Sequence, residues 1–236
     1  MDVFCRKEIK YLITRQQREI LEAEFSKRMV PDAYPHSSIH NIYYDTPDFR
    51  LIRHSLEHPV YKEKIRIRCY GSADGEVFLE MKKKYKGIVY KRRLTLPEAK
   101  AMDFMAGQGS LTDSQIGREL TYFRDFYQNL QPQVFLHYER DSWKGLGDPG
   151  LRITIDEDIH YRVTDLRLHD EADSQSILPP GMYLMEVKAE NAIPVWLAEL
   201  LAALKLSKTS FSKYGRAYER ELLQKIEETR GHTYAE

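Results

Sequence analysis

Cationic residues recur at every second position along several strand-like stretches, and this alternation constrains the fold more than any other feature of the sequence. Lys62, Lys64, Arg66 and Arg68 form the clearest example. Because successive side chains of a strand point to opposite faces, these four cations share one face. The same charged phase recurs in Arg6/Glu8/Lys10, Glu80/Lys82/Lys84, Lys91/Arg93, Arg152/Thr154/Asp156 and Glu186/Lys188/Glu190.

A sheet face that gathers like charges on neighbouring strands repels itself, and a bound anion would relieve that repulsion. An antiparallel closed β-barrel, with the cations inside and helices packed on its apolar outside, meets both requirements. We therefore predict an α+β fold of this kind. A sheet with one solvated face is the alternative, and it is the better explanation for any single strand.

The same patterns divide the chain into elements without a stretch that reads as a linker. We therefore predict a single domain over residues 1–236. Strands are expected at 4–14, 39–45, 60–70, 77–84, 87–96, 133–143, 151–156, 160–164 and 182–190, and helices at 15–28, 97–106, 113–129, 194–204 and about 213–229.

The overall charge balance argues against a general attraction to nucleic acid or to anionic membranes. Lys plus Arg number 36 and Asp plus Glu number 36, so any anion site must come from local clustering. Two cysteines are too few for a disulfide framework, and the charged residues after Cys5 do not form a secretory signal. We expect a cytoplasmic protein that does not insert into membranes, for which any membrane role requires a separate membrane-protein partner.

Eight short motifs, in this order along the chain, together resemble a known family. They are Arg6-Lys7-Glu8-Ile9-Lys10-Tyr11, Ile42-Tyr43-Tyr44-Asp45-Thr46, Lys64-Ile65-Arg66-Ile67-Arg68, Phe78-Leu79-Glu80-Met81-Lys82, Tyr138-Glu139-Arg140, Leu151-Arg152-Ile153-Thr154-Ile155-Asp156, Met185-Glu186-Val187-Lys188 and Ser210-Phe211-Ser212-Lys213-Tyr214. From Arg6 to about Tyr218, the chain resembles the polyphosphate-polymerase domain of the vacuolar transporter chaperone (VTC) proteins, within the CYTH-like triphosphate tunnel metalloenzymes.

The resemblance assigns roles to individual residues of this chain. Glu186 falls on the metal-binding carboxylate, and Tyr138 and Ser212 fall on neutral donors to phosphate. Arg6 stands where the hydrolase and cyclase branch has the first glutamate of Glu-x-Glu-x-Lys, which favours the polymerase branch. The cations that fall on phosphate-holding tunnel positions are Lys10, Arg66, Arg68, Lys82, Lys91, Arg140, Arg152 and Lys213.

Elementary chemistry agrees with these roles. Phosphoryl transfer needs phosphates held in line and their charge neutralised. A Mn²⁺ or Mg²⁺ ion needs oxygen ligands, which Glu186 with Glu80 or Glu190 would supply. Lys188 shares the face of Glu186 and is a further phosphate candidate, although a plain ion-pair network explains this pair too. Lys213 opens a helix whose N-terminus would attract phosphate, unless it is only an ordinary capped helix.

The leading functional hypothesis is a polyphosphate polymerase that transfers the terminal phosphate of ATP, or of another triphosphate, to an inorganic polyphosphate chain held in a cationic tunnel. A tripolyphosphate or organic triphosphate hydrolase and a non-catalytic polyphosphate-binding module are the alternatives. We expect the side chains of Arg66 and Arg68 to point into solvent-filled space. Catalysis is assigned to Arg66, Arg68, Lys82, Glu186 and Lys213.

Overall fold

The computed structural model describes residues 7–71, 75–168, 173–190 and 192–221, so Arg6 and the end of the predicted 213–229 helix lie outside it. The strands are β1 (Lys7–Thr14), β2 (Met29–Asp45), β3 (Tyr61–Tyr70), β4 (Glu76–Tyr85), β5 (Ile88–Pro97), β6 (Gln131–Gly145), β7 (Arg152–Arg162), β8 (Gln175–Ser176), β9 (Met182–Ala189) and β10 (Lys208–Thr209). The helices are α1 (Arg15–Arg28), α2 (Arg50–Leu56), α3 (Glu98–Met105), α4 (Gln115–Tyr127) and α5 (Val195–Ala203), and residues 213–221 are also helical.

Local capping explains why the first helix was predicted at its true bounds. The Thr14 hydroxyl accepts the backbone N–H of Gln17, and the Gln17 side chain accepts the backbone N–H of Thr14, which forms a capping box. A capping box depends only on residues close together in the sequence, here Thr14 and Gln17. For most strands with strict alternation, the predicted bounds likewise lie within a few residues of the observed ones.

Three local predictions were wrong. β2 begins at Met29, ten residues before the predicted start, because Pro31 and Pro35 obscure its pattern. The strands expected at 151–156 and 160–164 are one strand, β7, in which Asp158 takes a positive φ of 48°. The seven-residue α2 was missed, since a segment this short carries little periodicity.

The strands form a ten-stranded sheet in the order β10-β1-β9-β7-β6-β2-β3-β4-β5, with β8 paired to β7. β1 runs antiparallel to β9 and β10, β4 to β3 and β5, and β7 to β9. The α+β class with an antiparallel sheet is therefore confirmed. The predicted closure into a barrel was wrong: the order is linear, and no pairing joins β10 to β5 among the described residues.

The chain divides into two compact units, each built from three separate stretches of sequence. The first unit contains the described residues up to Ile39, together with His137–His160 and Leu178–Phe211. The second contains His40–Leu136, Tyr161–Ile177 and the described residues from Ser212. Neither unit is a continuous segment, and the single domain over residues 1–236 stays a prediction.

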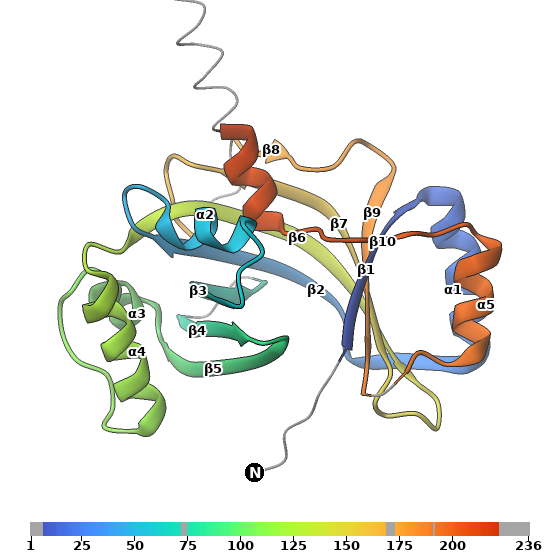
Figure 1. The fold of residues 1–236 in the computed structure, drawn as a ribbon, viewed down its shortest axis with the longest axis horizontal. Coiled ribbons are helices and arrows are strands. Elements are labelled where there is room, and N and C mark those ends of the chain that lie inside the picture. Colours follow the sequence, from blue (N-terminus) through green and yellow to red (C-terminus); the bar gives the residue numbers. More distant parts are fainter. Residues whose placement is uncertain (1–6, 72–74, 169–172, 191, 222–236) are drawn as a thin grey trace, which may run out of the picture. The chain divides into compact units, whose positions relative to one another are not determined.

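In the first unit, α1 and α5 lie side by side and cover the apolar face of β1, β7 and β9 (Figure 1). Leu21 and Phe25 of α1 and Leu197 of α5 are buried in one cluster with Ile153 and Val187 of the sheet. The Gln17 amide also donates to the Leu204 carbonyl at 3.1 Å, which ties the start of α1 to the end of α5. The charged face of these strands is therefore the face that the helices leave uncovered.

The second unit repeats this arrangement with α3 and α4 on the sheet of β3, β4 and β5 (Figure 1). Ile65, Ile67 and Leu79 pack against Phe104 of α3 and Phe123 of α4. Burial of these side chains fixes which face of each strand turns inward, because a one-residue slip would exchange the two faces. Among the described residues, no helix combines the length and the apolar composition that a membrane crossing requires.

Candidate functional site

The register of β3, β4 and β5 arranges the polar face of the second unit in cross-strand rows. Each row joins one residue from each strand, and paired residues point to the same side. The turn at Lys86 and Gly87 sets the β4–β5 register. Along the sheet the rows are Lys62–Lys84–Val89, Lys64–Lys82–Lys91, Arg66–Glu80–Arg93 and Arg68–Phe78–Thr95.

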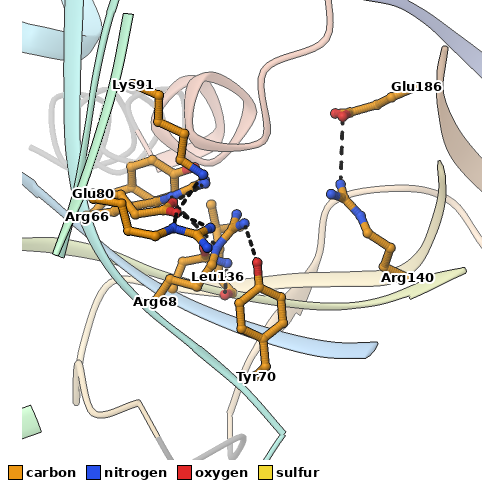
Figure 2. Close-up of polar contacts among 11 residues, drawn as sticks. Arg66, Arg68, Tyr70, Glu80, Lys91, Leu136, Arg140 and Glu186 are labelled. Carbon is orange, nitrogen blue, oxygen red and sulfur yellow. Dashed lines mark hydrogen bonds and ion pairs between the residues drawn. The ribbon is translucent and has the colours of Figure 1, made fainter. Parts of the chain in front are cut away.

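Glu80 is the centre of this face. Arg66 donates to Glu80 Oε2 through Nε at 2.9 Å and through Nη2 at 2.7 Å. Lys91 Nζ and Arg93 Nε lie 2.7 and 2.6 Å from Oε1. Arg68 Nε lies 3.9 Å from Oε2 and donates to Asn41 Oδ1 at 2.8 Å. Figure 2 shows Arg66, Arg68 and Lys91 converging on the carboxylate.

Burial and charge act in opposite directions on Glu80. Its side chain is only 3 % exposed. Burial alone would raise the pKa of the carboxyl, but the positive charges of Arg66, Arg68 and Lys91 hold that pKa well below its ordinary value. Burial lowers the pKa of Lys91, and Glu80 opposes the effect. Glu80 is therefore ionised and neutralises part of a cationic surface.

The expectation that Arg66 and Arg68 point into solvent-filled space was wrong. Arg68 is 6 % exposed, and its guanidinium also donates to the Tyr70 hydroxyl at 3.3 Å. Arg66 donates to the Tyr43 hydroxyl at 2.7 Å and pairs with Glu80. The sequence pattern gave the correct face for both arginines, but it did not reveal that a single carboxylate on the neighbouring strand would order them.

The helix at residues 213–221 brings its N-terminus to the same face. The Ser212 hydroxyl accepts hydrogen bonds from the Lys64 ammonium at 2.9 Å and from the backbone N–H of Gly215 at 3.1 Å, so Ser212 caps this helix. Lys213 is its first residue. The predicted pair of Ser212 and Lys213 therefore lies beside Lys64 of β3, and Lys82 stands opposite Lys64 on β4.

A buried carboxylate fixes the position of that helix. Asp45 accepts the backbone N–H groups of Leu51 and Ile52 at 2.8 and 3.0 Å and the Tyr214 hydroxyl at 2.8 Å. The Tyr214 ring stacks on Tyr43, with ring centroids 4.9 Å apart. Tyr43 in turn holds Arg66, so Asp45 and Tyr214 connect the capped helix to the arginine rows.

Glu186 of β9 is the centre of the polar face of the first unit. Its carboxylate lies 3.0 Å from Lys10 Nζ, 3.4 Å from Lys188 Nζ and 3.7 Å from Arg140 Nη2. The β1–β9 register places Lys10 directly opposite Glu186. Figure 2 shows Arg140 reaching toward Glu186. The structure thus brings together Lys10, Arg140, Glu186 and Lys188, which were predicted from the sequence.

Burial and neighbouring carboxylates shift the pKa values of Lys10, Arg140 and Lys188 to different extents. Burial would lower the pKa of Lys10, but Glu186 and Glu8 raise it above its ordinary value. Burial would likewise lower the pKa of Arg140, but Asp156 raises it. Burial lowers the pKa of Lys188, and Glu186 compensates only in part. Among these three cations, only Lys188 has a pKa below its ordinary value.

Three further predicted residues belong to the first unit. Arg152 pairs with Asp32 at 2.7 Å, although its backbone stands opposite Lys188. Tyr138 is buried, and the Arg140 guanidinium lies over its ring at 5.3 Å from the ring centroid. Glu190 lies against Gly150, where an added Cβ would meet the Glu190 side chain at 3.0 Å.

The residues present favour a metal held jointly with phosphate over a metal enclosed by protein alone. No group of three or more His, Cys, Asp or Glu ligands occurs in the described part of the chain. Cations contact both oxygens of Glu80 at 2.5 to 2.9 Å, closer than the 3.0 to 3.7 Å contacts of Glu186, so Glu80 is less open to a metal ion. Glu186 fits better. Thr154, its cross-strand neighbour, is 1 % exposed and has a hydroxyl without a hydrogen-bond partner, and Mg²⁺ commonly needs only one or two carboxylates besides phosphate oxygens.

Sequence reasoning missed several residues that build these sites. Arg93 was placed on the correct face but received no role, and the short β4–β5 turn was the signal that sets it opposite Glu80. Asp156, which holds Arg140 through two hydrogen bonds of 2.5 and 2.7 Å, was likewise seen only as part of a charged face. The pairing of Asp45 with Tyr214 spans 169 residues, and no local pattern could indicate it.

Several solved structures are similar to this chain. A candidate adenylate cyclase from Bacillus halodurans has a TM-score of 0.55 and 15 % identity, covering 88 % of this chain and 95 % of that chain, which shows a shared fold. A protein from Pyrococcus horikoshii has a TM-score of 0.47 and 14 % identity, with coverage of 91 % and 99 %. A capping enzyme triphosphatase of Mimivirus has a TM-score of 0.38 and 12 % identity, with coverage of 85 % and 89 %.

Sequence comparison identifies the family directly. No curated protein matches the chain. The family model of the VTC domain matches residues 5–221, which agrees with the resemblance drawn from Arg6 to about Tyr218. With most of its length matched, this chain belongs to the VTC domain family.

Proposed function

We propose that this protein is a metal-dependent phosphotransferase that moves the terminal phosphate of ATP onto a polyphosphate chain held along a cationic sheet face. The observation that carries the proposal is the charge of the β3–β5 face. Between the Lys62–Lys84 and Arg68–Phe78 pairs, this face carries one carboxylate, Glu80. Against it stand eight cations: Lys62, Lys64, Arg66, Arg68, Lys82, Lys84, Lys91 and Arg93.

That excess suits a long polyanion better than a short one. A bound triphosphate carries about four negative charges, and a divalent metal offsets two of them, so one triphosphate leaves most of these cations without a counter-charge. A product chain would supply the missing negative charge. This is the reason to place polymerisation before hydrolysis of a triphosphate.

The residues of the second unit would hold the phosphates in line. The Arg66 and Arg68 forks can each bind two phosphate oxygens, and Glu80 keeps both forks in place before substrate arrives. Ser212 and the backbone N–H groups of the following helix add neutral donors, with Lys213 beside them. Positioning and charge neutralisation of this kind are what phosphoryl transfer requires of a protein.

The residues of the first unit would hold the metal together with its phosphate ligands. Glu186 is the proposed carboxylate ligand, and Lys10, Arg140 and Lys188 surround it with charge for phosphate oxygens. A Mn²⁺ or Mg²⁺ ion held there would supply charge stabilisation to the phosphate oxygens that bind it. The cytoplasmic location and the separate membrane-protein partner stay predictions from the sequence.

Product analysis tests the proposal. Purified protein is incubated with ATP and Mn²⁺, and products are followed on a gel for chain length and in parallel for free orthophosphate. We expect long-chain polyphosphate to form after a lag that short polyphosphate primers reduce. The Glu186→Gln variant should give no product. Orthophosphate release without chain growth at any primer length would leave the hydrolase, and binding without turnover would leave the non-catalytic module.

A further inference from the structure

The polar face of the second unit changes its chemistry along the strands. The rows that contain Arg66, Arg93 and Arg68 carry arginines around Glu80. Toward the β4–β5 turn, the cations are all lysines: Lys64, Lys82 and Lys91 in one row, then Lys62 and Lys84 in the last. Arginine is therefore confined to one part of the face and lysine to the other.

This division matches two different tasks in holding a phosphate chain. Arginine presents a rigid fork that fixes two oxygens in a defined geometry, whereas lysine is a compact point charge on a flexible stem. Forks suit the position where a phosphate must be held still for reaction. Point charges suit positions where a chain must be retained and still advance by one unit for each addition.

The last row is also the least neutralised part of the face. Lys62 Nζ donates to the Ser55 carbonyl at 3.3 Å, and no carboxylate of the described residues forms an ion pair with Lys62 or Lys84. Burial lowers the pKa of Lys62, and the charges of Lys84 and Lys82 lower it further. An anion at this row would relieve a repulsion that the protein itself leaves in place.

Distance separates the last row from the arginine rows. Lys62 and Arg66 are four residues apart on β3, which corresponds to about 13 Å along an extended strand. A short triphosphate gripped by Arg66 and Arg68 therefore leaves Lys62 and Lys84 uncontacted. A linear chain with one negative charge on every repeating unit continues to them.

We propose that Lys62 and Lys84 form an outer subsite that binds the extended part of a linear polyphosphate chain, and that this row makes the protein prefer long chains over tripolyphosphate. The inference rests on the proposed function, because it takes the arginine rows as the place where the terminal phosphates are held. It assigns to two lysines a role in retaining the chain, separate from the chemistry of transfer.

The test compares two ligands and two double variants of the full chain. Lys62→Gln/Lys84→Gln removes the outer row, and Lys100→Gln/Lys144→Gln removes the same charge from two exposed positions, on α3 and β6. Dissociation constants for tripolyphosphate and for long-chain polyphosphate are measured at two salt concentrations. Thermal melts confirm folding, and Lys84→Gln alone serves if the double variant fails to fold.

We expect the outer-row variant to bind tripolyphosphate within about twofold of the wild type and to bind long chains about tenfold more weakly. Its binding of long chains should also depend less on salt, because fewer phosphate contacts release fewer counterions. The control variant should match the wild type for both ligands.

Three results would overturn the inference. Equal weakening of both ligands would place Lys62 and Lys84 within the triphosphate site. Unchanged affinity for both would make the row an ordinary solvated face, while the proposed function would stand. If the wild-type protein bound neither ligand, the proposed function itself would fail, and the outer subsite would fail with it.

Discussion

Replacing Glu80 by glutamine should destabilise the protein in the absence of ligand and strengthen its response to tripolyphosphate. The carboxylate is nearly inaccessible and pairs closely with Arg66, Lys91 and Arg93. Removing one partner of a buried ion pair typically costs about 3–5 kcal/mol, and we expect the lower part of this range because Lys91 and Arg93 are 46 % and 37 % exposed. For a chain of this size, about 1 kcal/mol lowers Tm by roughly 2–4 °C, so we expect Tm to fall by roughly 10 °C.

Tripolyphosphate should restore most of that loss, because its charges replace the missing carboxylate. A ligand present at 100 times its Kd stabilises the folded state by about 2.7 kcal/mol. The gain should be larger for Glu80→Gln than for the wild type, since the variant offers more uncompensated positive charge. Thermal melts of both proteins, with and without tripolyphosphate, measure the difference.

The stabilisation by Glu80 also has a defined pH dependence. The folded-state pKa of Glu80 lies below the unfolded value of 4.5, so its contribution is fully present above that value and is lost as pH falls through the folded pKa. The difference in unfolding free energy between wild type and Glu80→Gln should be constant from pH 7 to pH 5 and shrink in more acidic solution.

Glu119→Gln is the matched control for this experiment. Glu119 pairs with Arg92 at 2.8 Å, but both side chains are about a quarter exposed, so the loss should be about 1 kcal/mol or less. A Tm of Glu80→Gln within about 2 °C of the wild type would refute the view that Glu80 holds the cations together. An equal ligand response in the two proteins would refute the charge-replacement argument.

Three further predictions concern the ligand, the metal and the capped helix. Millimolar tripolyphosphate should raise the Tm of the wild type, an effect that weakens with added salt, whereas sulfate at matched ionic strength should not; equal melts in both anions would remove the phosphate site. Glu186→Gln should retain polyanion binding and lose metal-dependent turnover, as titration calorimetry and product assays would show; parallel loss of both would mean that Glu186 only organises the site. Tyr214→Phe removes the hydrogen bond to the buried Asp45, so it should cost about 1–2 kcal/mol in denaturant unfolding and weaken tripolyphosphate binding. If Tyr214→Phe lost this stability but bound tripolyphosphate as tightly as the wild type, the helix at residues 213–221 would not be part of the phosphate site.

The sequence by itself determined the faces of the strands. Alternation with a period of two is a local property, so Lys64, Arg66 and Arg68 could be placed opposite Ile65 and Ile67 before any pairing was known. Capping is also local, and the Thr14–Gln17 box set the start of α1. The family resemblance followed from the same information, because its motifs are short charged strands in a fixed order.

Only the tertiary structure decided which charges meet. Glu80 lies 14 positions from Arg66 and 13 from Arg93, and their contact depends on the register of two strand pairs. The sequence therefore left Glu80 as a metal-ligand candidate, whereas the structure engages both of its oxygens with cations. The linear strand order has the same origin, since closure of a sheet depends on which strands pair at its edges and no local pattern encodes that choice.

Pairing over still longer distances was equally invisible in the sequence. Asp45 and Tyr214 each sit in a recognisable motif, but their hydrogen bond exists only because the chain returns to β2 after 169 residues. Glu186 and Arg140 are 46 positions apart in the sequence and lie on different strands. The composition gives only a net charge of zero, and it does not show that Glu186 balances the charges of Lys10 and Lys188. Local periodicity thus fixes where a side chain points, and the packing of distant segments fixes what it meets.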